Sequence, residues 1–121
     1  MAFQRISTVK QMLASSPGSL EPTRDPDRLL GELCSALLTP KDADGMRRLL
    51  SDLCTPSELH TLAERWHVAQ LLDGTSLSYR DIHDAMGVST TTIVRIARFL
   101  RGEPHQGYRK ALDTMGGSNA R

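Results

Sequence analysis

Residues 78–100 decide the fold of this chain, and they read SYRDIHDAMGVSTTTIVRIARFL. The stretch predicts two short helices joined by the three-residue corner Gly87-Val88-Ser89. Glycine permits the positive φ that so tight a corner needs, and a serine directly before a helix is a favoured N-cap. Together these features predict a helix-turn-helix over about residues 78–101.

The apolar residues of this stretch are spaced as two crossed helices require. They lie where each helix must pack against the other, at Ile82, Met86, Val88, Ile93 and Ile96. One position departs from the motif, because His83 stands where a small residue is usual. Two interpretations are open: His83 either loosens the helix crossing slightly or leans outward.

The second helix begins with three threonines, and this run favours a functional surface. Three β-branched residues in succession favour helix poorly, so their presence at exposed positions points to a functional use. Thr can offer a hydroxyl and a methyl group to base edges in the major groove. Arginines on both helices suit DNA phosphates. The predicted DNA-contact residues are Tyr79, Arg80, His83, Ser89, Thr90, Thr91, Thr92, Arg98 and Arg101. The competing interpretation is a helical hairpin that serves packing alone.

The distribution of charge agrees with DNA binding without deciding it. The whole chain carries +1, but residues 78–110 hold six basic and three acidic side chains. A local positive field attracts phosphates even where the whole chain is near neutral. A solvated charged face explains the same residues equally well.

Upstream of the motif, capping signals predict three further helices. Asp25-Pro26 combines a good N-cap with proline at the first helical position, and residues 39–42 restart the chain for a second, shorter helix. Thr55-Pro56-Ser57-Glu58 is a capping box that opens a long helix. We expect this long helix to be buried on more than one side and to end at Gly74 in the left-handed conformation.

Downstream, Gly102 is expected to stop the second helix of the motif, and Pro104 to open a last short helix. No strand signal is present, so we expect an all-α fold of about six helices. The 121 residues suffice for one domain. The predicted organisation is a flexible N-terminal arm at 1–24, a helical DNA-binding domain at 25–115 and a loose C-terminal tail at 116–121.

Other classes of function find no support in the residues. The four histidines are scattered, and neither a nucleophile with its base nor a phosphate-binding loop is visible, so we expect no catalytic residue, no cofactor and no enzyme. Cys34 and Cys54 lack metal-site spacing, so we expect no metal. Both sit in apolar helical patterns, which predict buried free thiols. No secretory signal and no run approaching the ~18 apolar residues of a membrane span occurs, so we expect a cytoplasmic protein without a membrane partner.

Four strings carry a wider resemblance: LCTPSEL at residues 53–59, LAERWHVA at 62–69, YRDI at 79–82 and GVSTTTIVR at 87–95. With them, the segment from about Leu53 to Leu100 resembles the Trp repressor superfamily, and most closely its YerC/YecD branch. The resemblance implies six helices in an intertwined homodimer. In such a dimer the three N-terminal helices of both subunits form a shared core, from which the two helix-turn-helix units project.

The resemblance also implies a ligand site, which this chain matches in part. In tryptophan-binding members a threonine and two arginines hold the ligand, and Thr55, Arg65 and Arg95 match these positions as candidate effector-binding residues. Ile96 and Phe99 stand where those members have a glycine and a small serine. We therefore expect no tryptophan corepressor, while another small-molecule effector stays open. Each matched residue also has a structural explanation: a helix cap, an ion pair, or a contact with phosphate or a helix C-terminus.

The sequence thus predicts a sequence-specific transcriptional regulator, expected to be a repressor, that binds double-stranded DNA as a homodimer. The alternative is a module that uses the same helix-turn-helix fold to dock another protein. Salt separates the two, because counterion release makes DNA binding weaken steeply as salt rises.

Overall fold

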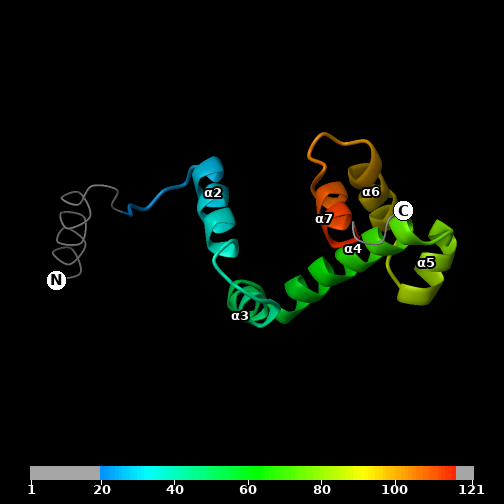
Figure 1. Cartoon of the computed structure of the whole chain (residues 1–121), viewed down its shortest axis with the longest axis horizontal. Helices are drawn as coiled ribbons and strands as arrows, with labels where there is room; N and C mark the ends of the chain where they lie inside the picture. Colours follow the sequence, from blue (N-terminus) through cyan, green and yellow to red (C-terminus); the bar gives the residue numbers. More distant parts are fainter. Residues whose placement is uncertain (1–19, 117–121) are drawn as a thin grey trace. The chain divides into compact units, whose positions relative to one another are not determined.

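The computed structural model describes residues 20–116, and within that range the chain forms six helices and no strand (Figure 1). The helices are α2 (Pro26–Leu37), α3 (Ala43–Leu53), α4 (Pro56–Gly74), α5 (Tyr79–Met86), α6 (Thr90–Arg101) and α7 (Gly107–Gly116). The predicted all-α class is confirmed. Among these residues no helix is both long and apolar enough to cross a membrane.

The chain divides into two compact units, with the boundary between Leu49 and Leu50. In the first unit, α2 begins as predicted, because the Asp25 carboxylate accepts a hydrogen bond from the Asp27 N–H at 3.2 Å. Helix α3 begins directly after the predicted restart, and the Asp42 carboxylate accepts from the Gly45 N–H at 2.8 Å. Neither α2 nor α3 contains a buried residue, so their leucines form no core within the described chain.

The second unit is built around α6, which packs against α4, α5 and α7. Figure 1 shows α5, α6 and α7 gathered at the C-terminal part of α4. Four residues of α6 are buried, more than any other helix contributes to the described core. The buried residues are Val68, Ala69, Leu72, Ile82, Val88, Ile93, Ile96, Ala97, Leu100 and Leu112.

Helix α4 starts as predicted, with both hydrogen bonds of the capping box between Thr55 and Glu58. These hydrogen bonds lower the pKa of the Glu58 carboxyl below its ordinary value, the bond from the Thr55 backbone contributing most. The expected burial on several sides holds for the second half of the helix alone. Leu62 in the first half is 46% exposed, because nothing in the described chain covers it.

The expected left-handed Gly74 is wrong. Gly74 is the last helical residue, and the chain leaves the helix through Thr75 in an extended conformation. Both the N–H and the hydroxyl of Thr75 donate to the Leu71 carbonyl, at 3.1 and 2.6 Å. The threonine thus satisfies the helix end, and no positive φ is needed at the glycine.

The last helix begins three residues later than predicted. Pro104 lies in the turns that follow α6, and α7 starts at Gly107 after Gln106, whose φ is 57°. The Gln106 side chain holds this bend by donating to the Glu103 carbonyl at 2.6 Å. Helix α7 also includes Gly116, which was predicted to belong to the C-terminal tail. The rest of that tail (117–121) and residues 1–19 of the predicted arm lie outside the described residues.

A charged contact fastens α7 to α4. The Arg109 guanidinium pairs with Asp73 at 2.7 Å and with Asp113 at 2.6 Å. Hydrogen bonds to these two carboxylates, Asp73 first, raise the pKa of Arg109 above its ordinary value. The side chain is therefore a fixed cation that joins residues 36 positions apart.

The predicted burial of the two cysteines is wrong, although both thiols are free as expected. Cys34 is exposed and Cys54 is half-buried. The apolar pattern around Cys34 is present, but no residue of α2 is buried. A sequence pattern indicates which face is apolar and leaves open which partner covers it.

The corner glycine and the helix-end glycine give a matched test of this geometry. Gly87→Ala should lower the free energy of unfolding by about 1–2 kcal/mol, because an L side chain at positive φ is strained; Gly87 has a φ of 74° with open space around its Cβ position. Gly74→Ala, where the added Cβ also meets nothing within 4 Å, should instead raise stability by roughly 0.5–1 kcal/mol. Urea titrations at one protein concentration measure both changes. Equal effects of the two substitutions would contradict a left-handed conformation at Gly87 and a helical one at Gly74.

Candidate nucleic-acid interface

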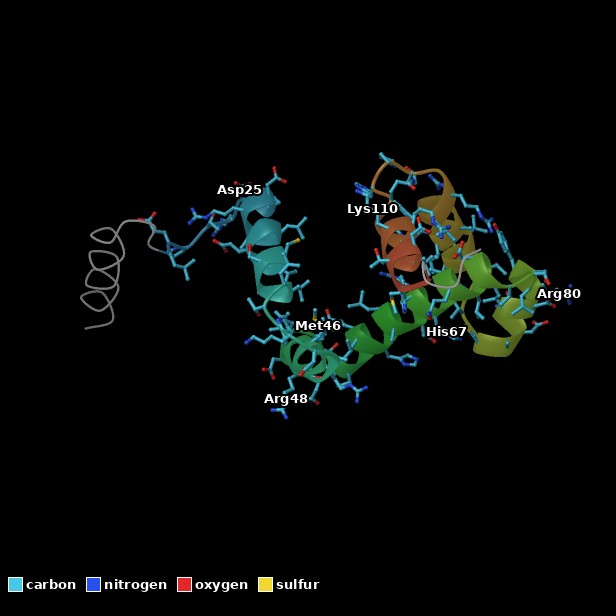
Figure 2. All side chains as sticks on the ribbon, in the orientation of Figure 1. Asp25, Met46, Arg48, His67, Arg80 and Lys110 are labelled. Atoms are coloured by element: carbon cyan, nitrogen blue, oxygen red, sulfur yellow. The ribbon has the colours of Figure 1, made fainter. Side chains whose placement is uncertain are left out.

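Helix α5 is fixed at its start by a second capping box. The Asp81 N–H donates to the Ser78 hydroxyl, and the Ser78 N–H donates to the Asp81 carboxylate, each at 3.0 Å. These bonds, the one from the Ser78 backbone above all, lower the pKa of Asp81 below its ordinary value. Tyr79 and Arg80 follow the cap directly, so its geometry sets where their side chains leave the helix. Figure 2 shows Arg80 at the outer end of α5, pointing away from the bundle.

The corner between α5 and α6 has the predicted conformation and one unexpected support. Gly87 is left-handed, with a φ of 74°, and its N–H donates to the His83 carbonyl at 2.8 Å. Val88 is buried beneath the corner. The His83 ring donates from Nδ1 to the Val88 carbonyl at 2.8 Å, since a carbonyl oxygen can only accept.

This contact resolves the open question about His83. The ring stays exposed and does not wedge the helices apart, and it ties the end of α5 to the residue before the cap of α6. Only Nε2 of the ring is left for a DNA contact. His83 is thus a support of the corner as well as a candidate contact residue.

The N-terminus of α6 presents its three threonines unequally. The Ser89 hydroxyl accepts from the Thr92 N–H at 3.1 Å and donates to the Thr92 hydroxyl at 2.9 Å. Thr92 is half-buried, and its hydroxyl is engaged in this cap. Thr90 and Thr91 are exposed, with no hydrogen bond from their hydroxyls in the described part of the chain. Of the predicted readers, these two are best placed to reach an outside partner.

Two arginines near the end of α6 flank a shallow groove of about 430 Å³. Arg101 donates to the Tyr79 hydroxyl at 3.2 Å, a contact between residues 22 positions apart that links the end of α6 to the start of α5. Arg98 pairs with Glu103 at 3.1 Å. The groove is lined by Tyr79, Val94, Ala97, Arg98, Arg101, Gly102 and Glu103. The predicted phosphate contacts of α6 therefore lie together at one edge of the helix-turn-helix.

The sequence reasoning missed two residues of this surface. Val94 is 45% exposed on α6, although it is apolar. Its position four residues after Thr90 is the signal that could have placed it on the same face. Glu103 left no such signal, because its pairing with Arg98 depends on how the chain turns after the helix ends.

The candidate effector residues come together only in part. Arg65 and Arg95 both line a second groove, of about 470 Å³, and Nε of Arg65 is buried without a hydrogen-bond partner in the described chain. The groove is walled by Arg65, Trp66, Arg95, Ile96, Phe99, His105, Gly107, Tyr108 and Ala111. Thr55 is not among these residues, and its hydroxyl accepts the Glu58 N–H in the helix cap.

Aromatic rings fill much of the wall of this second groove. The Arg95 guanidinium lies over the Phe99 ring, 4.7 Å from its centroid, and His105 stacks on the same ring at 6.2 Å. Trp66 stacks on Tyr108 at 6.4 Å. Ile96 is 2% exposed and belongs to the core, as its place in the motif predicted. Arg95 thus already faces a ring of this chain's own.

The described residues 20–116 contain no cluster of three or more His, Cys, Asp or Glu side chains that could hold a metal ion. The polar side chains that line the two grooves are arginines, two tyrosines, the imidazole of His105, the indole of Trp66 and one carboxylate, which is paired with Arg98. Such groups bind anions and bases more readily than cations.

Comparison with known proteins gives consistent matches. The family model described as Trp repressor protein matches residues 28–116. The uncharacterized protein YerC of Bacillus subtilis (strain 168) is 38% identical over 87 residues, which cover 71% of this chain and 81% of that protein. The crystal structure of a TrpR like protein from Eubacterium eligens ATCC 27750 is similar with a TM-score of 0.66 at 32% identity, covering 74% of this chain and 90% of the other.

Proposed function

The chain belongs to the Trp repressor family, and from this membership and the surface of α5 and α6 we propose that it is a sequence-specific DNA-binding repressor of transcription. The observation that carries the proposal is the capped start of α6, where Thr90 and Thr91 stand exposed with free hydroxyls. A recognition helix enters the major groove with its N-terminal residues first, so small side chains there allow close approach. The same proposal places the protein in the cytoplasm.

Within this proposal the contact residues divide by chemistry. Thr91 and Val94 contact base edges, the hydroxyl as donor or acceptor and the methyl groups against thymine. Arg80, Arg98 and Arg101 contact phosphates, which position the helix and carry no sequence information. Ser89 and His83 hold the corner through their bonds to Thr92 and Val88. The rigidity of the corner keeps the reading residues in register with the phosphate contacts.

A docking module for another protein is the alternative function, and Tyr79 with the threonines could serve it. The gathering of arginines around one groove of α6 favours DNA, because each cation there can release a counterion from a phosphate. A protein interface favours aromatic and apolar residues at its centre, and Val94 is the exposed large apolar residue of α6.

We further propose that the protein acts as a homodimer. Leu29, Leu30 and Leu33 of α2 are 49%, 59% and 37% exposed, and Leu53 and Leu62 are 50% and 46% exposed. Exposed apolar faces of this kind mark places where a partner binds. A second copy of the chain is the partner that two equivalent DNA half-sites require.

We also propose that DNA binding needs no tryptophan. An indole placed against Arg95 would meet the Phe99 ring, which already occupies the face of that guanidinium. Ile96 fills the core beneath it, and close-packed interiors leave few voids. The groove that remains beside Arg65 keeps room for a different effector with an anionic group.

Dimerisation should depend on the leucine face of α2. Leu30→Asp places a charge on that face and should shift sedimentation from a dimer to a monomer, whereas Ser35→Asp on the opposite side of the helix should leave the dimer intact. Sedimentation velocity over a range of concentrations measures both. A persistently monomeric mass of the unmodified protein, with helicity intact, would contradict the dimer.

Two variants should affect DNA binding in different ways. The test first recovers a bound site from a random DNA pool. Thr91→Ala should lose about 1–3 kcal/mol of discrimination between that site and altered sites, because a base contact is removed. Arg98→Ala should weaken binding to all sequences alike and flatten its salt dependence. Fluorescence anisotropy at several salt concentrations separates the two patterns. If neither variant changes binding while both stay folded, α6 is not the reader.

Tryptophan should not change the affinity for DNA. We expect the dissociation constant of the unmodified protein to be the same with and without millimolar L-tryptophan. Ile96→Gly should cost about 2–5 kcal/mol of stability, since it deletes a buried side chain, and should not create a tryptophan response while Phe99 remains. A tenfold or greater tightening of the unmodified protein by tryptophan would show that the site is open.

A further inference from the structure

The acidic residue Glu103 lies at the edge of the proposed phosphate-binding surface. It follows Gly102, the C-cap of α6, and its own N–H donates to the Arg98 carbonyl at 3.2 Å. Its carboxylate reaches back to the Arg98 guanidinium at 3.1 Å. The two side chains thus close a short ring at the end of the helix, within the groove that Arg101 and Tyr79 also line.

The two arginines of this groove differ in what their partners do to their charge. Arg101 is held by the hydroxyl of Tyr79, a neutral group that orients the guanidinium and leaves its charge uncompensated. Arg98 is held by a carboxylate, which offsets its charge. In the unbound protein, the charge of Arg98 is therefore offset by a bonded carboxylate, and the charge of Arg101 is not offset by its bonded hydroxyl.

The pair is built so that displacement is easy. Arg98 is 70% exposed and Glu103 is 32% exposed, so water screens their attraction. Exposed ion pairs of this kind contribute little to stability. A DNA phosphate offers a guanidinium anionic acceptor oxygens, as the Glu103 carboxylate does. In the duplex, the negative charges of the neighbouring phosphates add to its attraction for the guanidinium.

Resting on the proposed function, in which Arg98 contacts phosphate, we propose that Glu103 is an internal competitor for that phosphate. Its carboxylate occupies Arg98 in the free protein and must give way, or repel the backbone, when DNA binds. The competition acts on an interaction that carries no sequence information. Glu103 therefore weakens binding to all DNA and keeps the protein from being retained on unrelated sequences.

The direct test is Glu103→Gln, which removes the charge and keeps the size of the side chain. The backbone roles of residue 103, as donor to Arg98 and acceptor from Gln106, are unchanged. We expect this variant to bind both the recovered site and random DNA roughly two- to fivefold more tightly for each copy bound, the worth of an exposed ion pair. The slope of its salt dependence should be steeper by up to about 0.9 for each additional phosphate that the protein neutralises.

Two controls separate competition from a change in net charge. Asp113→Asn alters the net charge equally and removes one of the two carboxylates paired with Arg109, which keeps its pair with Asp73; it should leave DNA binding unchanged. In an Arg98→Ala background, Glu103→Gln should give no increase in affinity, because the guanidinium for which the two anions compete is absent. An increase that persists without Arg98, or an equal increase from Asp113→Asn, would overturn the proposal.

DNA binding by the unmodified protein distinguishes a failure of the competitor role of Glu103 from a failure of the proposed function. If it binds DNA with a steep salt dependence and Glu103→Gln does not tighten binding, the competitor role is wrong and the proposed function stands. If it binds no DNA at low salt, the proposed function fails first and Glu103 has no phosphate to compete for. Circular dichroism of each variant verifies that the helices are intact.

Discussion

The burial of one face of α6 is the constraint on which the C-terminal unit depends. Ile93, Ile96 and Leu100 are almost fully enclosed by α4, α5 and α7, so the helix cannot rotate without opening the core. Its opposite face is thereby presented in one orientation, with Thr91 and Val94 outward. The same helix supplies buried core residues and, under the proposed function, the surface that reads DNA. The packing of the helix therefore fixes the direction in which this exposed face points.

Local rules account for the parts of the fold that the sequence predicted well. The caps at Asp25, Thr55 and Ser89 depend on bonds within three residues, and the left-handed corner depends on one glycine. These interactions leave a pattern in a short window of sequence. The two helices and the corner of the helix-turn-helix could therefore be placed almost to the residue, while the DNA contacts assigned to them stay a prediction.

Two of the predictions that proved wrong concern helix ends whose position depends on contacts that the sequence pattern does not mark. Gly74 looked like a left-handed stop, but Thr75 closes the helix with its own hydroxyl. The start of α7 follows from the bend at Gln106, which no capping signal marks. In each case the residue type allowed both outcomes, and the three-dimensional neighbourhood selected one.

The ion pair between Arg109 and Asp73 has a consequence for how the chain acquires this structure. The corner between α5 and α6 is held by contacts between residues close in sequence, such as the bond from His83 to Val88. The pair from α7 to α4, in contrast, must close a loop of 36 residues. Contacts between near neighbours form quickly, and contacts across long loops form late, because the loss of chain entropy on closure comes first. As the chain leaves the ribosome, the corner and its two helices can assemble before α7 exists, and the docking of α7 through Arg109 is the step that completes the unit.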